Sequence, residues 1–113
     1  MAKKRAQTIA VVRGSGNVFA DLGFAQPEEE LTKAKLASLI RQVIERKRLT
    51  QVNAAAVMGI DQPKVSALLN GRLSNFSSER LMRLLTALGQ DVRITVRSKP
   101  AGRECGRIQV VAL

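Results

Sequence analysis

Residues 50–72 constrain the fold of this chain more than any other stretch of its sequence. Thr50 and Asp61 can each cap a helix, because an oxygen of either side chain can accept a hydrogen bond from a backbone N–H of the first turn. Gly59 separates the two helices, and Asn70-Gly71 is a typical helix end. The predicted helices are Gln51 to Met58 and Gln62 to Leu69. The stretch therefore predicts two short helices joined by a three-residue turn.

The small and apolar residues of this stretch fit two helices that cross closely. Ala55 is small where the helices would meet, and Gly59 can adopt the positive φ that the turn requires. Ile60, Val65 and Leu68 would bury one face of the second helix. An ordinary helical hairpin inside a bundle would use the same pattern, so these residues alone leave that alternative open.

The opposite face of the second helix separates these two alternatives. At about 100° per residue, that face presents short, uncharged side chains. They are Gln62, Pro63, Ser66, Ala67 and Asn70. A face turned only to water would be expected to carry Lys and Glu, whereas a helix that enters the major groove of DNA needs small groups that approach base edges. The pattern favours a helix-turn-helix that binds double-stranded DNA.

Charge and two depleted residue types narrow the function further. The 113 residues include 19 Lys and Arg against 9 Asp and Glu, a net charge of +10, which favours a polyanion as partner. There is no His and a single cysteine, Cys105, so we expect no internal disulfide, no metal site, no cofactor and no enzymatic activity. The basic start of the chain precedes an apolar run too short for a signal peptide, so we expect a cytoplasmic, nucleoid-associated protein.

Two further helices are expected to flank the central pair. One begins near Pro27, because the carboxylates of residues 28–30 complement the positive end of the helix dipole. It carries an apolar stripe and ends in the cationic residues 45–48. The last helix, over residues 78–88, follows a capped turn at residues 75–77 and has an apolar stripe of its own. Four helices would therefore enclose one core.

The two ends of the chain differ from its middle. The N-terminal end is basic and we expect it to be a flexible arm. Beyond the last helix, alternating apolar and polar residues predict a β-hairpin of residues 92–97 and 108–111. Two strands alone are marginal in water, so we expect them either to pair with a second subunit as a dimerisation element or to fray as a tail. The predicted divisions of the chain are residues 1–16, 17–90 and 91–113.

The central stretch resembles the XRE-type helix-turn-helix family. The residues that carry the resemblance are Leu49-Thr50-Gln51 and Gly59-Ile60-Asp61-Gln62-Pro63-Lys64-Val65-Ser66-Ala67-Leu68-Leu69-Asn70-Gly71. The leader at residues 17–24 and residues 73–89 are similar to the HigA-like antitoxins of toxin-antitoxin systems, which extends the resemblance to residues 17–97. With the C-terminal pattern, it implies a mainly α, lambda-repressor-like domain of four to five helices with a C-terminal β-hairpin. It also implies an autorepressing homodimer that binds a DNA operator and a cognate toxin.

The candidate DNA-binding residues divide into base contacts and phosphate contacts. Gln62 is expected to be the main base reader, because its amide can form two hydrogen bonds with one base. Ser66 and Asn70 are expected to bind bases or nearby phosphates, and Pro63 and Ala67 to touch thymine methyl groups. The expected phosphate contacts are Thr50, Gln51, Lys64 and Arg72, with Arg48 as a further candidate.

Three other functions remain open from the sequence. A stand-alone repressor would use the same DNA-binding residues without a toxin, and a protein-interaction module would use the helix pair to bind another protein. A protein that coats RNA or DNA would need aromatic side chains on which bases stack. The aromatic residues are Phe19, Phe24 and Phe76, too few to favour that function. The identity of the adjacent gene would distinguish an antitoxin from a stand-alone repressor.

Overall fold

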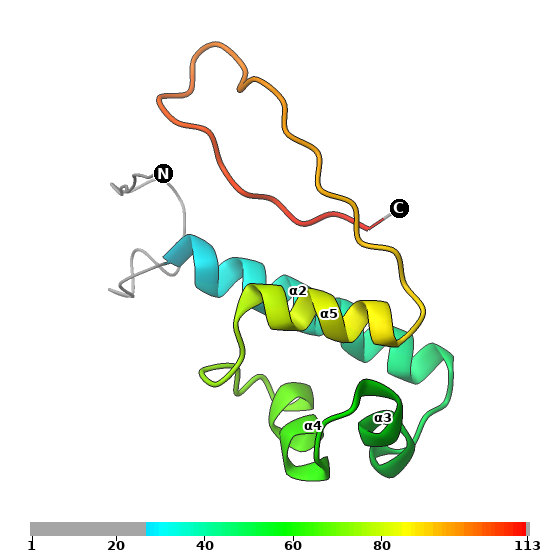
Figure 1. Cartoon of the computed structure of the whole chain (residues 1–113). Coiled ribbons are helices and arrows are strands. Elements are labelled where there is room, and N and C mark those ends of the chain that lie inside the picture. Colours follow the sequence, from blue (N-terminus) through cyan, green and yellow to red (C-terminus); the bar gives the residue numbers. More distant parts are fainter. Residues whose placement is uncertain (1–26, 113) are drawn as a thin grey trace. The chain divides into compact units, whose positions relative to one another are not determined.

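The computed structural model describes residues 27–112 of the chain. These residues form four α-helices followed by a long extended segment (Figure 1). The helices are α2 (Pro27–Arg46), α3 (Gln51–Met58), α4 (Gln62–Leu69) and α5 (Ser78–Ala87). The chain divides into two compact units, Met1–Leu31 and Thr32–Leu113. Of the first unit, only the start of α2 is described. The fold described below is therefore that of the second unit.

The longest helix, α2, begins and ends where its charges are favourable. Residues 28–30 place three carboxylates at the positive end of the helix dipole, and Arg46 lies at the negative end. After the helix, Arg48 adopts the left-handed conformation with φ 56°. The N–H of Leu49 then donates to the carbonyl of Ile44 at 3.1 Å. This turn ends α2 near the predicted residue and directs the chain into α3.

The predicted limits and caps of the central helix pair are confirmed. The Thr50 Oγ1 atom accepts a hydrogen bond from the N–H of Asn53 at 3.1 Å. At the start of α4, the Asp61 Oδ1 atom accepts one from the N–H of Lys64, also at 3.1 Å. Gly59 lies between the helices with φ 71°, a conformation that glycine adopts without steric cost. The sequence signals at the helix ends therefore act as expected.

The last helix, α5, ends one residue earlier than the predicted 78–88, with Leu88 as its C-terminal cap. Ser77 begins the helix, because its Oγ atom accepts a hydrogen bond from the N–H of Arg80 at 3.0 Å. The Arg80 guanidinium lies 5.4 Å from the ring centroid of Phe76, which is buried. The cation over this ring adds a weak attraction between the turn and the first turn of α5.

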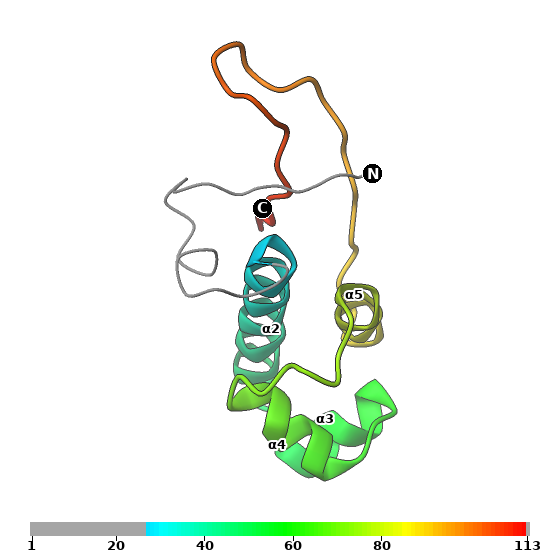
Figure 2. The same ribbon diagram turned by 90° about the vertical axis from the view of Figure 1, so that its left-hand side faces the viewer.

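One hydrophobic core joins all four helices. Residues with no exposed surface come from each of them: Ile40 of α2, Ala54 of α3, Val65 and Leu68 of α4, and Leu81 of α5. Figures 1 and 2 show α3 and α4 together on one side of α2 and α5. The core therefore holds the short helix pair against a frame of two longer helices.

The C-terminal residues 91–112, here named the C-terminal arm, differ from the sequence-based prediction. No strand is found among the described residues, so the predicted β-hairpin of residues 92–97 and 108–111 is absent. The arm instead runs outward, turns at Ala101 and Gly102, and returns (Figure 1). An extended limb becomes a strand only when its backbone pairs with a neighbour, and two strands by themselves gain little from doing so.

Two expectations concern residues outside the described range. The basic arm of residues 1–16 and the leader of residues 17–24 both lie there.

Within residues 27–112, none of the helices is long and apolar enough to cross a membrane. The same residues contain no group of three or more His, Cys, Asp or Glu side chains that could hold a metal ion.

Candidate nucleic-acid interface

Helix α4 turns one face to the core and the other to solvent. Val65 and Leu68 have no exposed surface, as their helical spacing predicts. Gln62, Pro63 and Lys64, in the first turn of the helix, are exposed. The burial of Val65 and Leu68 fixes the rotation of α4 about its axis. The N-terminal end of the helix is therefore accessible to a partner.

The starts of α3 and α4 together line a shallow groove. Gln51 of α3 and Gln62, Pro63 and Ser66 of α4 surround a hollow of about 270 Å³. Three of these side chains carry an amide or hydroxyl group, and none is charged. The groove therefore presents hydrogen-bond donors and acceptors together with an apolar ring, which are the groups that base edges in a major groove can meet.

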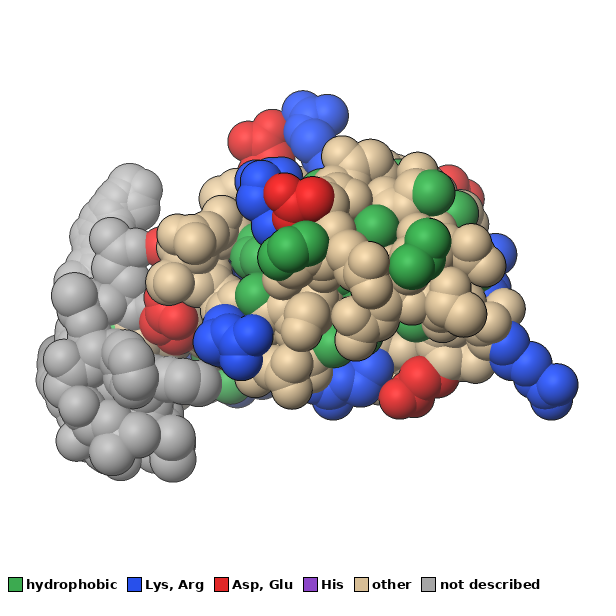
Figure 3. All heavy atoms as spheres, turned by 90° about the horizontal axis from the view of Figure 1, so that it is seen from below, with side chains coloured by type: hydrophobic (Ala, Val, Ile, Leu, Met, Phe, Trp, Pro, Cys, Tyr) green, Lys and Arg blue, Asp and Glu red, His purple; other side chains and the backbone are tan. Residues whose placement is uncertain are grey.

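The surface around this groove carries little charge. Residues 50–72 contain three charged side chains, Asp61, Lys64 and Arg72, and all three are exposed. Figure 3 shows the side of the molecule formed by α3 and α4 as largely uncharged, with Lys and Arg, and some Asp and Glu, mostly toward its edges. The Asp61 carboxylate caps α4. An uncharged centre with cations beside it fits DNA, in which bases lie between two phosphate backbones.

Thr50 and Gln51 lie at the N-terminal end of α3, where backbone N–H groups and the helix dipole favour an anion. The Thr50 oxygen accepts the capping hydrogen bond, and its hydroxyl proton can still donate to another acceptor. Phosphate contact by these two residues stays a prediction.

Asn70 is less available to DNA than the sequence suggested. Its Nδ2 atom donates to the carbonyl of Ser66 at 2.8 Å and lies 3.4 Å from the Ser66 Oγ atom. Asn70 is also the C-terminal cap of α4, so its amide N–H group helps to close the helix end. A base contact from Nδ2 would compete with this bond, whereas the Oδ1 atom can accept without breaking it.

The end of α4 also fixes the position of Arg72. Gly71 has φ 76°, and the backbone N–H of Arg72 donates to the carbonyl of Ala67 at 2.9 Å. The Arg72 side chain is exposed, whereas Ala67 is half-buried. The Arg72 side chain therefore extends into solvent from a hydrogen-bonded backbone, where a phosphate could reach it.

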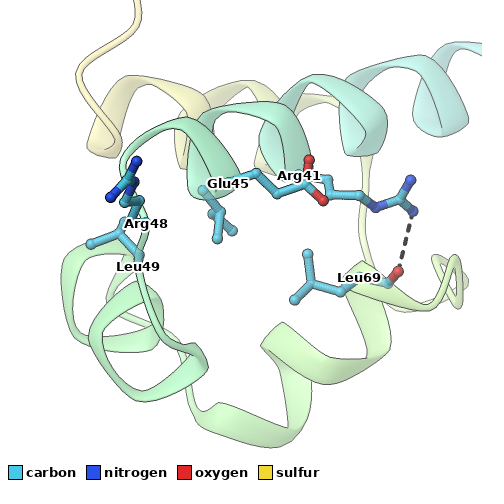
Figure 4. A pocket seen from close by; sticks show the side chains of 6 residues that line it. Arg41, Glu45, Arg48, Leu49 and Leu69 are labelled. Carbon is cyan, nitrogen blue, oxygen red and sulfur yellow. Dashed lines mark hydrogen bonds between the residues drawn. The ribbon is translucent and has the colours of Figure 1, made fainter.

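A second groove, beside the helix pair, involves a residue that the sequence analysis missed. It has a volume of about 370 Å³ and is lined by Arg41, Ile44, Glu45, Arg48, Leu49 and Leu69. Arg41 of α2 reaches toward α4, and its Nη2 atom donates to the carbonyl of Leu69 at 3.2 Å (Figure 4). Carbonyls in the last turn of a helix have no partner within the helix, so this bond ties α4 to α2.

No local signal in the sequence could have assigned this role to Arg41, because its acceptor is 28 residues away. Its spacing places it on the outer face of the first helix, where a solvated arginine is ordinary. Arg48 lies at the other end of the same groove (Figure 4). It does not line the hollow that contains Gln62.

The structure thus gathers the nine predicted site residues on one helix pair and the turn that follows it. The four that share the first groove are Gln51, Gln62, Pro63 and Ser66. The other five belong to the same segment: Thr50, Lys64, Ala67, Asn70 and Arg72. Their contact with DNA stays a prediction.

Comparison with known proteins agrees with this architecture. The family model described as "Helix-turn-helix domain" matches residues 18–97. A solved structure described as an "XRE Family Transcriptional Regulator" is 57% identical, with a TM-score of 0.74, over 76% of this chain and 97% of that chain. No curated protein matches the sequence. The chain therefore belongs to the XRE-type helix-turn-helix family of DNA-binding transcription regulators.

Proposed function

We propose that this protein binds one operator sequence in double-stranded DNA as a homodimer and represses its own gene. We further propose that it is the antitoxin of a toxin-antitoxin pair. Helix α4 enters the major groove, Gln62 reads a base, and Lys64 and Arg72 contact the flanking phosphates. No chemical step and no cofactor are part of this function.

The observation that carries the DNA-binding proposal is the groove at the starts of α3 and α4. Its lining residues are uncharged and accessible, although the chain as a whole has a net charge of +10. Non-specific attraction to DNA depends on cations, whereas discrimination between sequences depends on short polar groups that reach base edges. Such a groove on a cationic protein supports sequence-specific binding.

The antitoxin proposal has a narrower basis. It rests on the resemblance of residues 17–24 and 73–89 to HigA-like antitoxins. The solved relative is described as a transcription regulator. A stand-alone repressor would have the same groove, so the toxin needs a separate test.

The DNA-binding proposal is tested with the Gln62→Ala variant. We expect its affinity for the operator to fall by about 1 to 3 kcal/mol and its affinity for a scrambled duplex to stay nearly unchanged, because the amide discriminates between bases. Gln42→Ala is a matched control, since Gln42 is an exposed glutamine on α2 that lines neither groove. Fluorescence anisotropy with both duplexes measures these affinities.

The Arg72→Ala variant supplies the contrasting result. It should weaken binding to both duplexes alike and reduce the slope of log affinity against log salt by about one unit, because one phosphate contact is lost. Equal losses on both duplexes for Gln62→Ala would remove Gln62 from base recognition.

The antitoxin proposal is tested by co-expressing the full chain with the product of the adjacent gene. We expect that product to arrest growth when expressed alone, and the two proteins to co-purify when expressed together. An adjacent product that is harmless and does not bind would identify a stand-alone repressor.

A further inference from the structure

Helix α4 is held at its two ends by different parts of the molecule. At its start, the Asp61 side chain caps the helix, and Gln62 lies beside Gln51 of α3 in the first groove. At its end, the carbonyl of Leu69 accepts a hydrogen bond from Arg41 of α2 at 3.2 Å. The start and the end of α4 are therefore positioned by separate contacts.

The carbonyls in the last turn of α4 have different donors. Those of residues 66–68 accept hydrogen bonds from the backbone N–H groups of residues 70–72. The carbonyl of Leu69, the next in the chain, accepts from the Arg41 guanidinium. Carbonyls at a helix end have no partner within the helix and need another donor. For Leu69, a distant helix supplies that donor.

This bond crosses a gap in the packing between α2 and α4. The second groove, a hollow of about 370 Å³, is lined by residues of α2, of the turn that follows α2, and by Leu69 of α4. Figure 4 shows the Arg41 side chain extending to the Leu69 carbonyl. A hollow provides few van der Waals contacts, so at this place the hydrogen bond of Arg41 links the two helices.

We propose that Arg41 is a positioning residue for DNA binding, which holds the end of α4 and thereby sets where the Arg72 side chain meets a phosphate. Arg72 closely follows Leu69 in the chain, and its N–H donates to the carbonyl of Ala67 at 2.9 Å. A displacement of the last turn of α4 would therefore displace the backbone of Arg72. The inference rests on the proposed function, because it assigns to Arg41 an effect on the phosphate contact proposed for Arg72.

The geometry favours this role over a direct phosphate contact by Arg41 itself. The guanidinium is directed at the Leu69 carbonyl, and its Nη2 atom is engaged there. A charged donor strengthens such a hydrogen bond. Arg41 does not line the hollow that contains Gln62. A direct contact through the other N–H groups of Arg41 predicts a different result in the test.

The first measurement is hydrogen exchange of the full-length Arg41→Met variant without DNA. Methionine keeps a long side chain and a good helix propensity but cannot donate a hydrogen bond. The backbone N–H of Arg72 should exchange at least about threefold faster than in the unaltered chain, because the end of α4 opens more often. The N–H of Lys64, at the capped start of α4, should keep its rate.

Lys35→Met is the matched control for Arg41→Met. Lys35 is an exposed cation of α2 that lines neither groove, so this variant removes the same charge from the same helix. It should leave the exchange of both N–H groups unchanged. Circular dichroism should show native helicity for both variants.

The second measurement is a double-mutant cycle between Arg41→Met and Arg72→Ala, with the operator and a scrambled duplex. Arg41→Met alone should weaken binding to both duplexes by roughly twofold to tenfold, the size of one hydrogen bond, and by more than Lys35→Met does. In the Arg72→Ala background, Arg41→Met should weaken binding no more than Lys35→Met does, because the contact that it positions is absent. An equal loss with and without Arg72 would identify a direct phosphate contact and overturn the proposal.

Unchanged exchange of the Arg72 N–H in Arg41→Met would also overturn the proposal. This failure is distinguishable from failure of the proposed function. The latter would appear as equal losses on both duplexes for Gln62→Ala, or as no preference of the unaltered chain for the operator. The exchange measurement needs no DNA, so it tests the effect of Arg41 on the end of α4 independently of base recognition.

Discussion

The helix pair of residues 50–72 and the C-terminal arm both repeat apolar residues at regular intervals. These residues are buried in the helix pair and exposed in the arm. In the helix pair, Val65 has no exposed surface, whereas Val96 of the arm is 90% exposed. The two valines are equally apolar. The difference teaches that a periodic pattern defines a face but does not say whether the same chain supplies the surface that covers it.

The physical cause is where each element finds its hydrogen bonds. The backbone groups of α3 and α4 are bonded within each helix and at its caps, so neither helix needs a second segment beside it for its backbone hydrogen bonds. A strand needs a neighbouring strand for the same purpose. The arm has the sequence of a strand without a neighbour within residues 27–112, so its pattern alone produces no β-structure.

The largest expected contrast in stability is between the Val65→Asp and Val96→Asp substitutions. Val65→Asp should destabilise the domain by on the order of 5 kcal/mol, comparable to the whole stability of a small domain, because it buries an unpaired carboxylate. Val96→Asp should leave the unfolding of the monomer unchanged. Thermal denaturation by circular dichroism, at concentrations too low for dimerisation, measures both. Native stability of Val65→Asp would show that α4 is rotated differently about its axis.

An intermediate contrast is expected between two glycines with positive φ. Gly59 has φ 71° and Gly102 has φ 99°, and a Cβ at either would meet no atom within 4 Å. Substitution by alanine therefore tests backbone strain alone. Gly59→Ala should destabilise the domain by about 1 to 2 kcal/mol, whereas Gly102→Ala should not change monomer unfolding, because the turn of the arm lies outside the core. Urea denaturation gives both values, and equal losses would mean that the arm unfolds together with the helices.

The smallest contrast is between two exposed aspartates. Asp61→Ala removes the cap of α4 and should destabilise the domain by about 1 kcal/mol. Asp91→Ala, at the start of the arm, removes the same charge without removing a cap and should change stability by less than about 0.5 kcal/mol. Urea denaturation at more than one salt concentration separates the cap from general charge effects. A loss from Asp61→Ala that disappeared at high salt would indicate electrostatics rather than capping.

Local sequence signals predicted the helical part of the fold well because each acts within a few residues. Thr50 and Asp61 cap helices through hydrogen bonds to the third residue after them. Gly59 and Gly71 end helices by adopting positive φ. These signals need no knowledge of the rest of the molecule, so the limits of α3 and α4 could be predicted to the residue.

Contacts between distant segments could not be predicted in this way. The Arg41 bond to the carbonyl of Leu69 joins α2 to α4, and neither residue differs in type or spacing from an ordinary surface arginine and a core leucine. The sequence also could not show that the side chain of Asn70 donates a hydrogen bond to the carbonyl of Ser66. An asparagine at a helix end can either cap the helix or point outward.

The sequence by itself determined that residues 50–72 form two capped helices with one buried and one uncharged face, since capping and helical periodicity are local. The tertiary structure decided that Gln51 joins Gln62 in one groove and that the arm forms no strand within the described chain. Which helix starts meet depends on how the core packs. Whether an extended segment becomes a strand depends on a neighbouring backbone, which its own residues do not supply.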